Sequence, residues 1–342
     1  MRAVVFERPG VVESRELPMP VPREGEVVVK VAACGICGTD THIYRGEYMS
    51  TYPLVGGHEM AGTIAAVGHG VGDWREGDRV TLDPNVFCGH CYFCKNNRAN
   101  HCLNFAGIGV TVDGGFAEYV RVPARNVYAL PTGLSFGEAA LIEPVSCVIY
   151  ALERIRMHPG SSVVVFGAGP MGQLMQRACQ HSGAAVVTCV DLDVARLELA
   201  RELGARNTVV AGPEAPEQLR QIAPHGFDVV IDATGSPAVV EALPRYAKPT
   251  AKILYFGVCP SDAKVLVSPY DIFKNDWEIY GSFALRYTFY PAIDFIESGA
   301  IRVLPIISHR ISLEQLPGIF RGEPLPASDV GVGSRLKVLV RP

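Results

Sequence analysis

Four cysteines lie close together in one short segment, C-G-H-C-Y-F-C-K-N-N-R-A-N-H-C, between residues 88 and 102. The Cys-x2-Cys-x2-Cys-x7-Cys spacing places four thiolates where they can surround one Zn²⁺ ion tetrahedrally. Buried reduced cysteine is the ordinary alternative, but three thiols at strict spacing among Gly, Asn and Lys are not typical of a core. Four protein ligands leave no open position, so the sequence predicts a structural zinc site at Cys88, Cys91, Cys94 and Cys102.

Three further residues are candidates for a second metal site that stays open to substrate. Cys37 begins the motif C-G-T-D-T-H, and His58 and Glu59 occur in G-G-H-E. A thiolate, an imidazole and a carboxylate are all zinc ligands, and three of them leave a fourth position for water or substrate. Cys34 forms a Cys-x2-Cys pair with Cys37, but its place at the end of a strand predicts a core residue. Taken singly, each residue is more typical of ordinary structure, so the prediction depends on their combination.

A glycine-rich turn follows the apolar strand S-V-V-V-F. Gly167, Gly169 and Gly172 form G-x-G-x-x-G, whose glycines permit a tight turn, close approach of a pyrophosphate and close helix–strand packing. Asp191 ends the next predicted strand, 19 residues after Gly172, where a carboxylate can accept a hydrogen bond from the adenosine ribose and repel a 2′-phosphate. Arg196 lies nearby and could favour such a phosphate, although a solvated helix residue is its more ordinary role. The sequence therefore predicts a dinucleotide site for NAD in preference to NADP.

The composition limits the partners and the compartment. The 342 residues are 48% hydrophobic and 19% charged, carry a net charge of −4 and include no Lys/Arg-rich run. This balance supports packed cores and argues against a nucleic-acid partner. We find neither a signal-peptide core nor an apolar run of about 18 residues, so no membrane partner is expected. Ten cysteines without an export signal, four of them at metal spacing, predict a reducing compartment, the cytoplasm.

The secondary-structure pattern changes near residue 135. Short β-rich segments such as 1–7 and 26–31, separated by Gly, Asp and Pro, predict a compact barrel-like β domain. Residues 135–154 have helical spacing, with a break or kink after Glu143 marked by proline. From residue 161 strands and helices alternate, which is typical of a doubly wound parallel sheet. The closing R-L-K-V-L-V-R-P is expected to rejoin the first domain, giving an α/β protein of two domains.

Together these motifs resemble those of the zinc-containing medium-chain dehydrogenases/reductases. C-G-T-D-T-H, G-H-E, the four-cysteine segment, I-E-P and G-A-G-P-M-G occur in that family's order along nearly the whole chain. The resemblance implies a GroES-like β-barrel catalytic domain, residues 1–145 and 286–342, and an inserted Rossmann domain, residues 146–285. It also implies one catalytic and one structural zinc, bound NAD(P), and a homo-oligomer, commonly a dimer or tetramer. Glu143, where classical alcohol dehydrogenases have a cysteine ligand, makes the chain most similar to the sorbitol (polyol) dehydrogenase branch.

The resemblance also implies roles for individual residues. Thr39 and His42 match the family's proton-relay positions. The zinc of such a site lowers the pKa of a bound hydroxyl, and hydride passes from the alcohol to NAD. A carboxylate-rich metal shell suits small oxygen-rich substrates that chelate through adjacent hydroxyls, which favours a polyol. The residues that would hold the catalytic zinc are Cys37, His58, Glu59 and, directly or through the zinc-bound water, Glu143.

The sequence departs from the polyol pattern at one place. Sorbitol-type enzymes usually have Phe-Arg-Tyr after the final Rossmann strand, with the Arg touching substrate hydroxyls, whereas this chain has G-S-F-A-L-R-Y-T. Arg286 and Tyr287 are displaced by two residues, or Ala284 and Leu285 occupy their places. An L-threonine 3-dehydrogenase, a secondary-alcohol or butanediol dehydrogenase, and a non-catalytic NAD- and zinc-binding redox sensor stay open as alternatives. The apolar candidates for the pocket wall are Phe105, Phe283 and Ile43.

Overall fold

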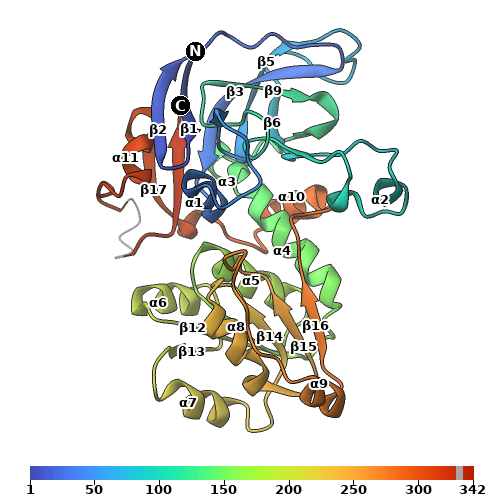
Figure 1. Ribbon diagram of the computed structural model, residues 1–342, viewed down its shortest axis with the longest axis vertical. Coiled ribbons are helices and arrows are strands. Elements are labelled where there is room, and N and C mark those ends of the chain that lie inside the picture. The colour runs from blue at the N-terminus through green and yellow to red at the C-terminus, as the bar shows by residue number, and fades with distance from the viewer. Residues whose placement is uncertain (329–333) are drawn as a thin grey trace.

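The structure is a computed structural model that describes residues 1–328 and 334–342, and it forms two units stacked along the long axis of the molecule (Figure 1). One unit contains the strands near both termini, and the other contains a six-stranded parallel sheet with helices around it. Helix α4 (Ile142–Ile155) runs from the first unit to the second (Figure 1). In the described part of the chain, no helix is long and apolar enough to cross a membrane.

The first unit is built around a seven-stranded sheet of order β10-β6-β5-β3-β18-β17, in which β9 also pairs with β3. Strand β3 is central and buried along most of its length, as expected for a strand with neighbours on both edges. Strand β18 pairs antiparallel with β3, with Leu339 opposite Gly35 and Val340 opposite Cys34, so residues near 337 lie beside the start of α1. The strands of this sheet are β3 (Glu26–Gly35), β5 (Glu59–Val67), β6 (Arg79–Leu82), β9 (Tyr119–Pro123), β10 (Val127–Ala129), β17 (Ile307–Ser312) and β18 (Lys337–Arg341).

Smaller elements complete this unit. A three-stranded sheet of order β2-β1-β4 contains β1 (Arg2–Arg8), β2 (Val11–Glu16) and β4 (Leu54–Val55), and a further pair is formed by β7 (Asn85–Val86) and β8 (Ala106–Gly107). The helices are α1 (Gly38–Arg45), α2 (Tyr92–Lys95), α3 (Phe136–Ala140) and α11 (Leu316–Phe320), with 3₁₀ turns at Ala99–His101, Ala124–Asn126, Leu304–Ile306 and Leu313–Gln315. In Figure 1, α2 lies on a loop that extends to one side of the β-rich unit.

The second unit confirms the predicted doubly wound parallel sheet. Its strand order is β13-β12-β11-β14-β15-β16, and every pairing is parallel. The order reverses between β11 and β14, and ligands of such sheets bind outside the carboxyl ends of the strands at that reversal. The strands are β11 (Ser162–Phe166), β12 (Val186–Asp191), β13 (Asn207–Val210), β14 (Phe227–Asp232), β15 (Ala247–Tyr255) and β16 (Glu278–Gly281). The surrounding helices are α5 (Pro170–His181), α6 (Val194–Glu202), α7 (Ala215–Ile222), α8 (Pro237–Ala242), the 3₁₀ turn Leu243–Tyr246 and α9 (Pro269–Asn275).

The predicted break after Glu143 is misplaced. Helix α3 ends at Ala140, the chain passes through Leu141, and α4 begins at Ile142. Pro144 is the third residue of α4, within the first turn, where a backbone N–H has no partner inside the helix and its loss costs nothing. The proline therefore helps to start a helix here and does not interrupt one.

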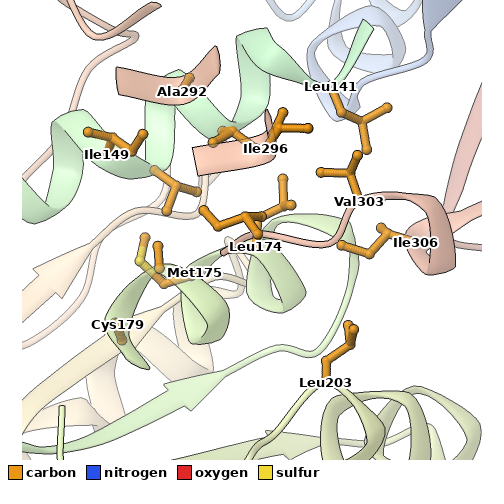
Figure 2. Close-up of a cluster of buried hydrophobic side chains, with 14 of the residues drawn as sticks. Leu141, Ile149, Leu174, Met175, Cys179, Leu203, Ala292, Ile296, Val303 and Ile306 are labelled. Carbon is orange, nitrogen blue, oxygen red and sulfur yellow. The ribbon is translucent and has the colours of Figure 1, made fainter. Parts of the chain in front are cut away.

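A hydrophobic core joins the two units along α4. Figure 2 shows Ile149 of α4 facing Leu174 and Met175 of α5, with Ile296 of α10 (Phe289–Glu297) close by. Leu174 and Met175 are fully buried, and each contributes about 2 kcal/mol of hydrophobic stabilisation. The predicted boundary between residues 145 and 146 falls inside α4, so this one helix packs in both units. The domain limits themselves stay a prediction.

Candidate active site and metal centres

A cavity of about 350 Å³ lies between the two units. The first unit contributes Cys37, Thr39, His42, His58, Glu59 and Glu143 to its lining. The second contributes Met171 of α5, Thr234 after β14 and Phe256 after β15, all at the carboxyl side of the parallel sheet where its strand order reverses. The predicted open metal site and the carboxyl edge of the parallel sheet, where the nucleotide is predicted to bind (the nucleotide edge), therefore line the same cavity.

The three predicted ligands Cys37, His58 and Glu59 converge in this cavity. Their ligand atoms all lie within 4.8 Å of one another, close enough to share one metal ion. Pairing of β3 with β5 sets Gly35 opposite Glu59, and a side chain at Gly35 would place its Cβ 2.0 Å from Glu59 Oε2. Glycine at position 35 is therefore required for the carboxylate to occupy its place. We call these three residues the open cluster.

Lys337 is a partner of Glu59 that the motif analysis missed. Its Nζ donates to Glu59 Oε1 at 2.6 Å, to Oε2 at 2.7 Å and to the Ile36 carbonyl at 3.1 Å, and both charged side chains are buried. Although burial opposes the charge, the Glu59 carboxylate raises the pKa of Lys337. Each carboxylate oxygen has two lone pairs, so Glu59 can accept from the lysine and still offer electrons to a cation. The one sequence feature that could have indicated this role is that Lys337 is a lone lysine within the apolar C-terminal strand R-L-K-V-L-V-R-P.

A second buried carboxylate, that of Asp40, lies beside the imidazole of His58. Asp40 Oδ2 accepts from the Cys37 backbone N–H at 2.8 Å, and its Oδ1 lies 3.5 Å from His58 Nδ1. Burial acts against the imidazolium, yet Asp40 and Cys37 together raise the pKa of His58 well above its ordinary value. These negative groups would equally favour a bound cation. The donor set of sulfur, nitrogen and oxygen, and the surplus of buried negative charge around it, therefore fit a zinc ion.

Glu143 enters the cavity from the first turn of α4. Its carboxyl group is not within 4.8 Å of all three members of the open cluster, so the geometry leaves its role as ligand or as holder of a water a prediction. Burial raises the pKa of Glu143 to about 7. Cys147, one helical turn later, places its Sγ 3.4 Å from Glu143 Oε1 and also lines the cavity. Its thiol is outside the open cluster, in agreement with its position out of register in the sequence.

The predicted relay residues lie on α1 at the edge of the same cavity. Thr39 Oγ1 is 3.7 Å from Cys37 Sγ, so a hydroxyl stands next to the open cluster. His42 Nδ1 lies 2.8 Å from a Glu47 carboxylate oxygen, on the more exposed side of the helix. The path from a reacting hydroxyl toward solvent therefore has donors and acceptors at both ends, while the relay role itself remains a prediction.

The four cysteines of residues 88–102 also converge. All four sulfurs lie within 4.8 Å of one another, and backbone amides point at them, including Cys88 N to Cys102 Sγ at 3.3 Å and Asn104 N to the same sulfur at 3.3 Å. Hydrogen bonds from backbone amides, that of His90 first, lower the pKa of Cys88 to about 6. Sulfurs surrounded by N–H donors suit thiolates, so this closed cluster fits a zinc ion held by the protein alone. Cys34 is fully buried in β3 and belongs to neither cluster.

The glycine turn has the geometry that a pyrophosphate needs. Gly167 has φ +99°, which favours glycine, and a Cβ at Gly172 would lie 1.8 Å from the Gly167 carbonyl oxygen. Helix α5 begins directly after Gly169 and points its N-terminus at the turn. Asp191 Oδ2 accepts from the Ala168 N–H at 2.6 Å, which fixes the carboxylate at the end of β12 beside the turn.

Arg196 is more than a solvated helix residue. It is half-buried, a Cβ at Gly169 would lie 3.8 Å from its Nη1, and its Nη2 donates to the Arg335 carbonyl at 3.0 Å. An ion pair with Asp193 at 3.6 Å holds part of its charge. The guanidinium therefore lies beside the nucleotide turn, within reach of an anionic ligand.

The pocket wall corrects and extends the sequence analysis. Phe105 and Phe283 line the cavity as predicted, but Ile43 is fully buried in the core of the first unit and does not. Arg286 is also outside the lining, because its Nη1 donates to the Asn97 carbonyl at 2.5 Å on the four-cysteine segment. Residues that the motif analysis missed are Tyr48, Met49, Asn85 and Ser282.

A closed metal cluster, an open metal cluster and a dinucleotide turn that faces the open one define a zinc-dependent oxidoreductase. The profile of the alcohol dehydrogenase GroES-like domain matches residues 23–132, and that of the zinc-binding dehydrogenases matches residues 170–298. The chain belongs to the zinc-containing medium-chain dehydrogenases/reductases, and it is an enzyme of the alcohol dehydrogenase type. The GroES-like and Rossmann folds expected from the resemblance are confirmed.

Individual relatives are similar along nearly the whole chain. D-arabinitol dehydrogenase 1 of Uromyces fabae is 35% identical over 320 residues, which are 92% of this chain and 91% of the relative. Sorbitol dehydrogenase of Bacillus subtilis is 35% identical over 322 residues, with coverage of 92% and 91%. A solved zinc-binding dehydrogenase from Sinorhizobium meliloti, bound to NADP, has a TM-score of 0.93 and 35% identity, covering 100% of this chain and 99% of that one.

Proposed function

We propose that this enzyme oxidises a polyol, or a closely similar secondary alcohol, at the open cluster and passes the hydride to NAD. The observation that carries the proposal is the meeting of Cys37, His58 and Glu59 with the nucleotide edge of the parallel sheet in one cavity. A bound zinc ion would act there as a Lewis acid on the reacting hydroxyl. Similarity to arabinitol and sorbitol dehydrogenases supports a polyol as substrate.

The chain's own residues prepare the reaction in three ways. Lys337 holds the carboxylate of the open cluster in place, and the Asp40 carboxylate lies beside its imidazole. Thr39, beside Cys37, is placed to accept the proton of the substrate hydroxyl and to hand it on toward His42 and Glu47. The apolar surfaces of Phe105 and Phe283 keep bulk water from the reacting carbon.

Charge at the nucleotide edge supports NAD. Asp191, fixed by the Ala168 N–H, would accept from an unmodified adenosine ribose and repel a 2′-phosphate. Arg196 is the opposing feature, and the solved relative from Sinorhizobium meliloti carries NADP. In our proposal Arg196 contacts the diphosphate side of the turn, next to Gly169, and leaves the ribose specificity to Asp191.

The cavity wall supports a substrate recognised through its oxygens by hydroxyl and carboxyl groups, without a guanidinium. Polar groups reach the cavity from Tyr48, Asn85, Glu143 and Ser282, while Arg286 is engaged elsewhere. An uncharged polyol satisfies this lining. A substrate with a carboxylate, such as threonine, would meet no lining arginine or lysine among the described residues.

A substrate panel tests the proposal. Purified zinc-loaded enzyme is incubated with sorbitol, xylitol, arabitol, 2,3-butanediol and threonine, each with NAD and with NADP, and absorbance at the reduced nicotinamide band is followed. The highest kcat/KM is expected for a polyol with NAD. Threonine as the best substrate, or NADP as the better acceptor, would contradict the corresponding part of the proposal, and fewer than two zinc ions per chain would contradict the metal assignment.

The enzyme's surroundings follow from the same features. The closed cluster needs reduced thiols, which supports a cytoplasmic location. Strand β16 lies at the edge of the parallel sheet, and an edge strand of this kind can pair with a second copy, which supports a homo-oligomer. Size-exclusion chromatography with light scattering would test this arrangement.

A further inference from the structure

The segment that forms one wall of the substrate cavity is held from outside the cavity. Residues 282–287, the wall segment, follow β16, and Ser282, Phe283 and Ala284 of this segment line the cavity. Ala284 and Tyr287 both have φ +54°, a left-handed conformation that non-glycine residues adopt only when their surroundings impose it. The contacts that hold the wall segment in this conformation therefore determine its position in the cavity.

One of these contacts comes from the four-cysteine segment, residues 88–102. Asn100 is fully buried, and its Nδ2 donates to the Phe283 carbonyl at 3.0 Å and to the Tyr150 hydroxyl at 3.2 Å. Both hydrogens of one amide are thus used to join the wall segment to α4. A buried amide with fixed partners at both hydrogens defines position as well as contributing stability.

Neighbouring contacts join the same two segments. Arg286 Nη1 donates to the Asn97 carbonyl at 2.5 Å, and its guanidinium lies 5.3 Å from the centre of the Tyr150 ring. The rings of His101 and Phe283 are stacked at 5.8 Å. Arg286 is thus part of the attachment between the wall segment and the four-cysteine segment, and it does not line the cavity.

We propose that Asn100 is a positioning residue for substrate selection: by holding the Phe283 carbonyl it fixes the apolar wall of the cavity, and so makes the pocket depend on the four-cysteine loop. The inference rests on the proposed alcohol dehydrogenase function and adds to it a determinant of substrate size. Loss of the Asn100 contact leaves the open cluster and the nucleotide turn untouched, so binding of large substrates changes while the chemical step does not.

The first test compares Asn100→Ala with Asn96→Ala. Asn96 belongs to the same loop, but within the described residues its exposed side-chain amide donates only to the Tyr92 carbonyl at 2.7 Å, so it is a matched control. We expect Asn100→Ala to raise the KM for sorbitol relative to that for 2-propanol by up to about tenfold, with kcat within about twofold, because the free energy of one buried hydrogen bond limits how firmly Asn100 holds the wall. Asn96→Ala should resemble the wild type. Both variants should retain two zinc ions per chain.

A double-mutant cycle separates positioning from general damage. If Asn100 acts through the Phe283 ring, Asn100→Ala adds no further change in the KM ratio once Phe283→Ala is present. Tyr150→Phe keeps the ring under Arg286 and removes only the second acceptor of Asn100, so it folds most easily and should change the ratio about twofold. This variant decides the matter if Asn100→Ala is not recovered folded.

The outcomes distinguish this inference from the proposed function. A wild-type enzyme that oxidises none of the alcohols contradicts the proposed function. An active wild type whose KM ratio is unchanged by Asn100→Ala, or by Tyr150→Phe where that variant decides, overturns the role of Asn100 alone. Equal KM increases for both substrates would also overturn it, because they would show a general loss of structure.

Discussion

The two metal clusters differ in how the chain builds them. The closed cluster takes all its ligands from residues 88–102, and backbone amides of the same loop donate to its sulfurs. The open cluster takes its three ligands from the start of α1 and the start of β5, and it is supported by Asp40 and by Lys337 on β18. One site is therefore a property of a loop, and the other is a property of the assembled sheet.

This difference explains what each cluster can do. The closed cluster lies in a half-exposed loop, where four sulfurs complete a coordination shell without help from distant residues. The open cluster keeps buried carboxylates and an imidazole next to a cavity, and buried charges are stable only with partners. A metal site that keeps a position open for substrate thus needs contacts from residues distant in the sequence, whereas the closed cluster does not.

The largest effect is expected from replacing one cysteine of either cluster with serine. Cys37→Ser should lower kcat/KM about 10³-fold or more, because zinc at the open cluster would no longer stabilise the negative charge that develops on the substrate oxygen in the transition state. The zinc of the closed cluster and most of the stability of the fold should remain. Cys94→Ser should do the opposite, lowering the melting temperature while leaving activity per folded enzyme within a few-fold. Metal analysis should find one zinc per chain in each variant. Equal losses of activity in both would contradict the division of roles.

The support of the open cluster is tested next. Lys337→Met leaves Glu59 buried without its cation, and we expect metal-free protein to lose about 3–5 kcal/mol of unfolding free energy. Zinc should restore part of this loss, since a cation then faces the carboxylate again. Lys95→Met, at an exposed lysine of the cysteine loop, is the control and should change stability by less than about 0.5 kcal/mol. Urea unfolding with and without zinc measures both, and a loss under about 1 kcal/mol would contradict the interpretation.

Removal of the hydroxyl beside the open cluster should have a smaller effect on rate than removal of a ligand. Thr39→Val keeps the volume at the cavity edge, and the proposed proton path loses its first acceptor. We expect kcat to fall about 10²-fold with both zinc ions retained. Steady-state kinetics combined with metal analysis provides the measurement. Activity within twofold of wild type would show that Thr39 only bonds within its own turn.

The mildest test compares thiol reactivity in metal-free protein. Backbone N–H donors lower the pKa of Cys88 to about 6, whereas burial raises the pKa of Cys147 beside Glu143. Iodoacetamide at pH 7 should therefore label Cys88 at least about tenfold faster than Cys147, and the rate at Cys88 should reach half its maximum near pH 6 and level off above about pH 7, where nearly all of the thiol is ionised. Mass spectrometry of timed samples would show the order, and earlier labelling of Cys147 would contradict it.

The local features were predictable from sequence, and the long-range ones were not. The spacing of the four cysteines and of Gly167, Gly169 and Gly172 is read within one loop, and the structure gives both the expected local geometry. Lys337 and Tyr48 were missed because neither belongs to a motif, and only the pairing of β18 with β3 or the shape of the cavity shows their place. The departure from Phe-Arg-Tyr around Arg286 is visible in the sequence, but the bond of Arg286 to the Asn97 carbonyl required the structure.

Errors came from interpreting one residue without its neighbours. The proline after Glu143 predicts a break or kink there, whereas the first turn of a helix tolerates proline. Ile43 is predicted as an apolar part of the pocket wall, but on α1 its side chain is fully buried in the core of the first unit. Both errors concern the position of a residue on a helix. Spacing in the sequence shows which turn or face a residue occupies only once the first residue of the helix is known.

Helix α4 fixes a distance as well as a contact. Its first turn carries Glu143 into the cavity, and Ile149 packs against α5, the helix that begins at the nucleotide turn. With 14 residues at 1.5 Å each, α4 spans about 21 Å as one stiff rod. The length and packing of α4 would then set the separation between an alcohol carbon and the nicotinamide ring. Repacking near Ile149 would slow hydride transfer without altering any group that touches either reactant.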